Sequence, residues 1–193
     1  MFKNLKIGVR LGVGFGLVVA LMIALGFVGI LRVAELNAKI DYLTNDLYPK
    51  SLRTNAIING VDEDARSLRN IMLADSEEER NNQKARIDAN RPKYVDLFAQ
   101  QEKTFSTEAG KAALKAVIDV RVEYVKVRDK TLELAMNNQK AEAIALLFSD
   151  VRKYQTPYLE NLKKLNELQN TLMEKAGSEA EALATSTRTL III

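Results

Sequence analysis

The sequence contains no cysteine and no histidine, and it has only three prolines among 193 residues. Without cysteine and histidine there is no Cys–His nucleophile pair, no Ser–His–Asp triad and no metal site with cysteine or histidine ligands. The Glu-x-x-His pattern of di-iron helical bundles is excluded for the same reason. We therefore expect a protein that is not an enzyme and that holds no cofactor and no metal.

Charge is absent from residues 11–31, which lie between Arg10 and Arg32. At about 1.5 Å per residue this run is long enough to cross a hydrocarbon core of about 30 Å. It is too long for the apolar core of a signal peptide, which has roughly 7–15 residues, and no small-residue cleavage site follows it. We predict an uncleaved transmembrane helix over residues 11–31.

Basic residues precede this span without an acidic neighbour: Lys3, Lys6 and Arg10. The positive-inside rule places residues 1–10 in the cytoplasm and the chain from residue 32 onward outside, in the periplasm next to the inner membrane. These three residues carry the whole net charge of +3, because the remaining 25 basic residues balance 25 acidic ones. The high pI is thus an orientation signal, and we expect no nucleic-acid partner.

The sequence ends on an apolar run, Thr189-Leu190-Ile191-Ile192-Ile193. We expect residues 189–193 to be the start of a second, truncated transmembrane helix, and the alternative is a short apolar tail that packs on a core. With two spans, residues 32–188 form one periplasmic ligand-binding domain.

Apolar residues in the region 32–188 recur at three- and four-residue steps, which is typical of amphipathic helices. A break at Ala74-Asp75-Ser76 is followed by a capping box of Ser76 and Glu79. A further start lies at Ser106-Thr107-Glu108, and Asn137-Asn138 mark a helix end. Four long helices with three short connections predict an all-α, antiparallel up-down four-helix bundle, with kinks and not ends at Pro49 and Pro157.

The first sixteen residues, with the Arg10-Leu11 pair and the Gly14-Phe15-Gly16 element, resemble the start of bacterial methyl-accepting chemotaxis proteins with a four-helix-bundle sensor domain. The segment from Arg66 to Leu73 resembles the arginine-bearing part of the first helix in that family. The resemblance implies ligand sensing outside the cell and a signal that passes through the second span. Similar sensor domains also head histidine kinases and cyclic-dinucleotide enzymes, and nothing before residue 193 distinguishes these outputs.

A receptor for a small anion needs arginines that are partly withdrawn from water, because the guanidinium fork matches a carboxylate. At about 100° per residue, Arg121 and Arg128 lie roughly 20° apart on their helix, and Tyr124 lies within roughly 60° of Arg121. Arg69 borders the apolar stripe of the first helix. We expect these four residues to bind the ligand, and the alternative is that an arginine pairs with an acid such as Asp129 and needs no ligand.

The resemblance adds Arg66 and Thr156 to the candidate ligand contacts, since they match the helix-one arginines and the helix-four polar element of related receptors. Without a ligand role, Thr156 is simply the residue before a kink. We expect the ligand to be a small organic acid, such as a di- or tricarboxylate of the citric-acid cycle, or an amino acid.

Two further patterns indicate contacts between helices. Small residues recur every four positions in the membrane span, which allows close approach of a second span: Gly8, Gly12, Gly16, Ala20 and Ala24. Heptad-like apolar spacing after the span predicts a homodimer, on Val33, Leu36, Ile40, Leu43 and Leu47. A competing interpretation is a membrane-anchored helical adaptor that binds a protein partner.

Overall fold

The computed structural model describes residues 6–192, with side chains as far as Leu190. The chain is about 95% helical, and no strand occurs in this range. The predicted all-α four-helix fold is therefore confirmed. The described elements are α1 (Ile7–Asp41), the π-helical turn η1 (Tyr42–Leu47), α2 (Tyr48–Leu73), α3 (Glu77–Thr104), α4 (Glu108–Met136), α5 (Lys140–Leu146), the π-helical turn η2 (Leu147–Val151) and α6 (Arg152–Ile192).

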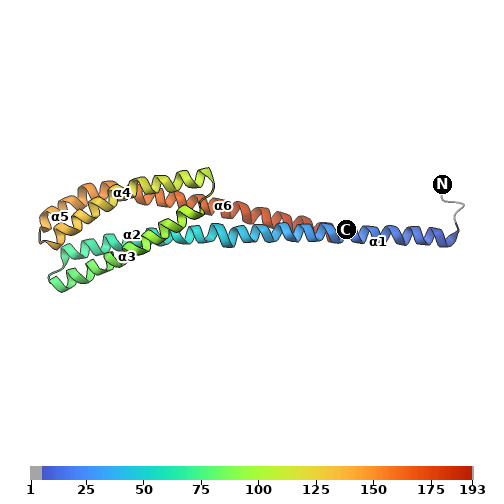
Figure 1. Ribbon diagram of the computed structural model, residues 1–193, viewed down its shortest axis with the longest axis horizontal. Coiled ribbons are helices and arrows are strands. Elements are labelled where there is room, and N and C mark those ends of the chain that lie inside the picture. Colours follow the sequence, from blue (N-terminus) through green and yellow to red (C-terminus); the bar gives the residue numbers. More distant parts are fainter. Residues whose placement is uncertain (1–5, 193) are drawn as a thin grey trace. The chain divides into compact units, whose positions relative to one another are not determined.

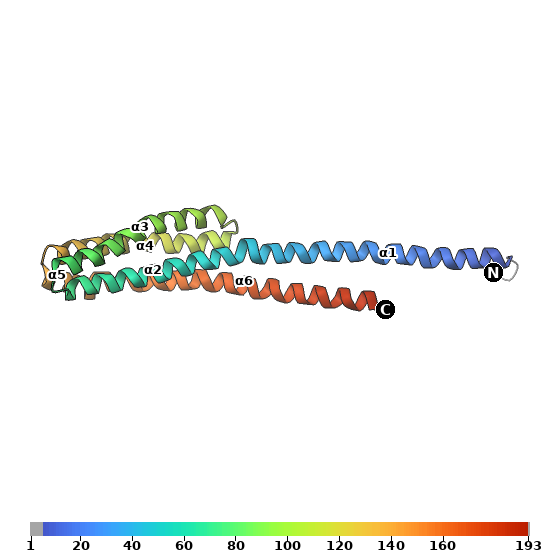
Figure 2. The same ribbon diagram turned by 90° about the horizontal axis from the view of Figure 1, so that it is seen from below.

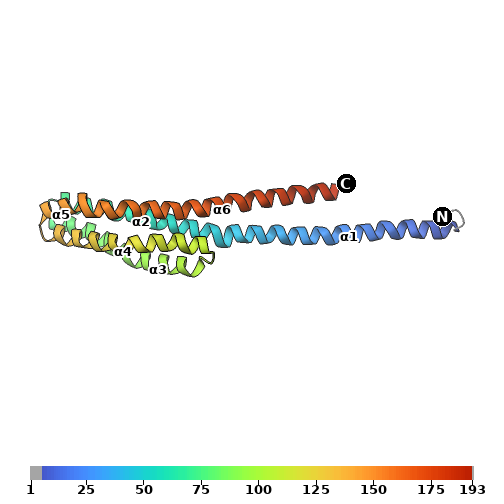
Figure 3. The ribbon, with the colours of Figure 1, turned by 90° about the horizontal axis from the view of Figure 1, so that it is seen from above.

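The chain divides into two compact units. The larger unit, Asp46–Leu172, holds α2, α3, α4, α5 and the first half of α6. Figures 1, 2 and 3 show α2, α3 and α4 side by side, each running opposite to the one before it. The segment α5–η2–α6 continues without a break, runs opposite to α4 and returns next to α2. Because each connection is short, consecutive helices are neighbours, as expected for an up-down bundle.

The helix starts and stops follow the signals in the sequence. The Ser76 hydroxyl accepts a hydrogen bond from the Glu79 backbone N–H at 3.2 Å, and Thr107 caps α4 through the Gly110 N–H at 3.1 Å. Asn138 ends the α4 region with a φ of 61°, in the left-handed conformation that asparagine tolerates. Side-chain caps of this kind satisfy N–H groups that have no partner inside the helix.

Neither Pro49 nor Pro157 ends its helical segment, as the sequence predicts. Each follows a π-helical turn, η1 just before Pro49 and η2 a few residues before Pro157. Proline lacks an N–H and its ring collides with the carbonyl four residues earlier. For Pro49 that carbonyl belongs to Asn45 inside η1, where the hydrogen-bond register is already shifted.

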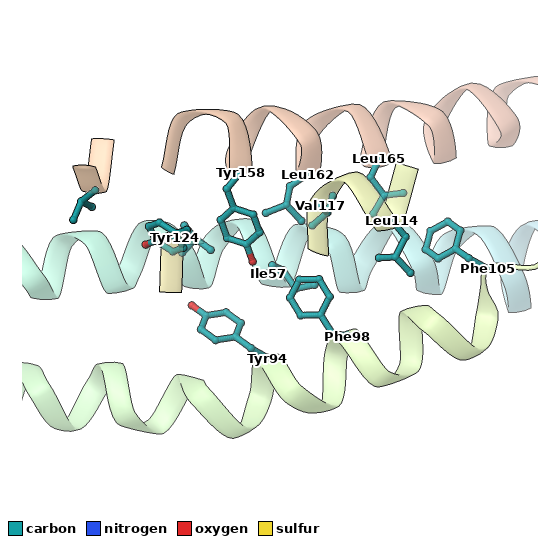
Figure 4. Packing of buried hydrophobic residues seen from close by; sticks show 12 residues of the cluster. Ile57, Tyr94, Phe98, Phe105, Leu114, Val117, Tyr124, Tyr158, Leu162 and Leu165 are labelled. Carbon is teal, nitrogen blue, oxygen red and sulfur yellow. The ribbon is translucent and has the colours of Figure 1, made fainter. Parts of the chain in front are cut away.

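The core of the bundle consists of two apolar clusters separated by a polar layer. Figure 4 shows the first cluster, with the side chains of Tyr94, Phe98 and Tyr158 turned inward between the helices. The second cluster lies toward the α2–α3 connection and includes Leu68, Ile87 and Leu132. The polar layer between them contains Asp64, Ser67, Asn90, Arg128 and Thr131, all of them buried.

The smaller unit combines the described part of the chain up to Asn45 with α6 from Met173 onward. Lys39 of α1 pairs with Glu179 of α6 at 2.7 Å, and Ala176 and Leu183 of α6 are buried. Within the described residues one helix is long and apolar enough to cross a membrane, and its most apolar 18-residue window has a mean hydropathy of 2.6 and is not buried at all. The predicted span 11–31 belongs to this helix. Residues 1–5 of the predicted cytoplasmic N-terminus and residue 193 of the predicted second span lie outside the described residues.

Candidate functional site

An ionic network crosses the polar layer of the bundle. Arg128 of α4 donates from Nη1 to the Asp64 carboxylate of α2 at 3.0 Å, and both side chains are at most 4% exposed. Its Nε and Nη2 donate to Asp129 Oδ1 at 2.9 and 2.8 Å. Asn90 of α3 donates to the other Asp64 oxygen at 2.9 Å. The network therefore satisfies the Arg128 guanidinium from within the protein.

The network continues to the surface of α3. Arg91 binds Asp129 through both terminal nitrogens at 2.9 Å each, and its Nε donates to Asp88 at 3.2 Å. Burial acts to raise the pKa of Asp129, but the hydrogen bonds and charges of Arg91 and Arg128 outweigh it and hold that pKa below its ordinary value. For Asp64 burial is the stronger effect and raises the pKa, against hydrogen bonding by Asn90 and the charge of Arg128.

The predicted ligand-binding residues of α4 lie in separate environments. Tyr124 is buried and stacks on Tyr158, with ring centroids 5.2 Å apart. Arg121 is half-buried and lies over the Phe98 ring at 4.5 Å from its centroid, a cation–π arrangement. Arg128 is ion-paired, which is the alternative that the sequence left open for it. The Arg121 side chain thus contacts an aromatic ring and the Arg128 side chain contacts carboxylates, while both cations also lie near the Tyr158 hydroxyl.

The remaining predicted residues lie on the outside of the bundle. Arg69 and Thr156 are exposed, and neither lines a described pocket. Arg66 is exposed as well, but it lines a groove between α2 and α3.

This groove has a volume of about 280 Å³. Successive turns of the two helices line it: Ala56, Asn59, Gly60, Glu63 and Arg66 from α2, and Asn90, Lys93, Tyr94 and Leu97 from α3. The three- and four-residue spacing places each set on one face of its helix. The groove thus combines two cations, one acid, two amides and a phenol with a short apolar wall.

Tyr94 lines the groove with a side chain that is almost fully buried. Its ring is buried, and its hydroxyl has no hydrogen-bond partner of normal geometry, although the Asp64 carboxylate lies nearby. Burial, and then the charge of Asp64, raise the pKa of this hydroxyl far above its ordinary value, so it stays a proton donor at neutral pH. Gly60 makes this position possible, because a Cβ there would lie 2.7 Å from the Tyr94 oxygen.

Comparison with known protein families matches residues 4–184 to a four helix bundle sensory module for signal transduction. The chain belongs to this family. The module is that of methyl-accepting chemotaxis proteins, so the resemblance noted at the start of the sequence is confirmed over nearly the whole chain. A search of curated proteins finds no significant match.

For a sensory module of this family, the sequence reveals the fold more completely than the site. The sequence alone does not single out Asp64. An acid three residues after Val61 and four before Leu68 nevertheless lies within an apolar stripe, and that position is the signal for a buried ion pair. The sequence does not indicate Lys93 as a ligand contact, and it places Tyr94 on an apolar stripe, where an aromatic residue is usually part of the core. Their convergence with Arg66 depends on how α2 and α3 pack, which no local pattern encodes.

Proposed function

We propose that this chain is the sensor region of a transmembrane chemoreceptor that binds a small anionic ligand in the periplasm and passes the signal across the inner membrane. The observation that carries the proposal is the family match over residues 4–184. The uncharged and exposed residues 11–31 support a membrane anchor, and the basic residues before them support a cytoplasmic N-terminus. In this proposal the protein binds its ligand and does not transform it.

Charge in the bundle favours a ligand with few carboxylates. Arg128 faces two acids of its own protein, so it is not available to a di- or tricarboxylate. Arg66 and Arg121 have no ion pair among the described residues, but they lie on different helices, α2 and α4. A small organic acid or an amino acid with one carboxylate at the binding point remains the best-supported class.

We also propose that the receptor acts as a homodimer. Val33 and Ile40 of α1, seven residues apart, are about half exposed, with 55% and 46% of their surface accessible. Leu36 and Leu43 are partly covered. An apolar seam with seven-residue spacing is the pattern that a second helix covers in a coiled coil.

A thermal-shift screen of the full chain in lipid nanodiscs tests the ligand. Organic acids and amino acids are added one at a time, and a ligand that binds the folded state raises the melting temperature as its concentration passes the dissociation constant. We expect at least one carboxylate in the panel to do so. If none does, while neutral sugars or a protein partner stabilise the chain, the proposal of an anion sensor is wrong.

A further inference from the structure

The groove between α2 and α3 carries one excess positive charge, from Arg66 and Lys93 against Glu63. Lys93 donates to the neutral amide of Asn90 at 3.2 Å, so its contact leaves the ammonium charge uncompensated. Arg66 has no ion pair with the described residues, although Glu63 lies one helical turn away on the same face. Two cations and one acid at the same groove favour an anion with a single charge.

The groove is also lined by a hydrogen-bond donor that makes no bond of normal geometry, although Asp64 lies beside it. The Tyr94 hydroxyl is buried, lines the groove and has no partner of normal geometry. Buried polar groups are nearly always satisfied in folded proteins, so a donor without a well-formed bond beside two cations favours a ligand acceptor at that position. An oxygen atom of a ligand in the groove would accept this hydrogen bond.

The walls and the size of the groove set the rest of the ligand. Ala56 and Leu97 provide an apolar wall beside the polar groups. The volume of about 280 Å³ lies just below the usual range of about 300–1,000 Å³ for small-molecule sites, so only a small molecule fits.

We propose that this groove binds a small organic monocarboxylate, whose carboxylate pairs with Arg66 and Lys93 and accepts a hydrogen bond from Tyr94. The proposal rests on the proposed sensory function and names a site within one bundle. It differs from the arginine set predicted on α4, because Arg121 and Arg128 take no part.

Isothermal titration of the full chain in nanodiscs with lactate and propionate tests the site. Removing one charge-assisted contact weakens binding at least tenfold, so Arg66→Gln and Lys93→Gln should each show this loss. Tyr94→Phe should weaken binding severalfold and leave the chain folded, because it removes the hydroxyl and keeps the buried ring. Glu63→Gln should strengthen binding, since it removes the one acid.

Matched controls are available on α3. Arg86→Gln and Lys103→Gln remove exposed cations that do not line the groove, and lactate affinity should not change. Succinate and citrate should bind more weakly than lactate, because their further charges find no cation there.

Three results would overturn the proposal. The first is an affinity for lactate and propionate that is unchanged in both Arg66→Gln and Tyr94→Phe. The second is tighter binding of citrate than of lactate. The third is no binding of either monocarboxylate at millimolar concentrations. In this last case the sensory function still stands if another compound in the thermal-shift panel stabilises the chain, and it fails with the site if none does.

Discussion

Replacing Arg128 by methionine should destabilise the bundle strongly, because Asp64 would stay buried without its counter-ion. The two groups are 3.0 Å apart, and their side chains are 4% and 1% exposed. Breaking a buried ion pair by removing one partner costs about 3–5 kcal/mol. The Asn90 amide would remain as a donor to Asp64, which favours the lower part of this range.

A double-mutant cycle separates the pair from its surroundings. Asp64→Asn leaves Arg128 bound to Asp129, so its cost should be about 1–2 kcal/mol. The double variant Asp64→Asn/Arg128→Met has no uncompensated charge between α2 and α4. Its loss in free energy of unfolding should therefore be smaller than the sum of the two single losses by at least about 1 kcal/mol. Urea unfolding of the full chain in detergent, followed by helical circular dichroism, provides the free energies.

The pH dependence of Arg128→Met gives an internal check. Burial already raises the pKa of Asp64, and loss of the arginine removes a charge that lowers it. The folded variant therefore holds a proton on Asp64 more readily than the unfolded chain does. The stability deficit of the variant should shrink as the pH is lowered from neutrality toward 3.8, the ordinary value for an aspartate. Arg69→Met, an exposed control, should change stability by less than about 0.5 kcal/mol. The reasoning fails if Arg128→Met is as stable as wild type and loses only the stabilisation by ligand, since Arg128 would then be a ligand cation.

Three further predictions concern pH, the first turn of α4 and the membrane span. Asp129 and Asp88 have pKa values below the ordinary 3.8. The stability that these carboxylates contribute is therefore present above pH 3.8 and is lost as the pH falls through their folded-state pKa values. Melting temperatures measured in an acid titration will detect this loss. Thr107→Ala removes the α4 cap and should cost about 1 kcal/mol in urea unfolding, whereas Thr107→Ser should restore most of it. Gly12→Ile with Gly16→Ile should weaken cysteine cross-linking between spans without reducing membrane insertion, and an unchanged cross-linking pattern would remove the packing role.

The sequence predicts the helices well because their determinants are local. Ser76, Thr107 and Asn138 each mark a boundary through bonds or dihedral angles within a few residues. The roles of the charged residues are harder to predict, because they depend on what a neighbouring helix presents. Helical spacing alone cannot tell that Arg128 meets Asp64, 64 positions away, while Arg121 meets the face of Phe98.

The central claim is that the bundle faces the periplasm and is anchored by residues 11–31. The chain has no cysteine, so a single introduced thiol is an unambiguous reporter. Asp75→Cys lies exposed in the α2–α3 connection and Lys6→Cys lies exposed before the span. In intact cells a membrane-impermeant maleimide should label the thiol at position 75 and should label position 6 only after the membrane is opened. Labelling of position 6 but not of position 75 in intact cells would contradict the account.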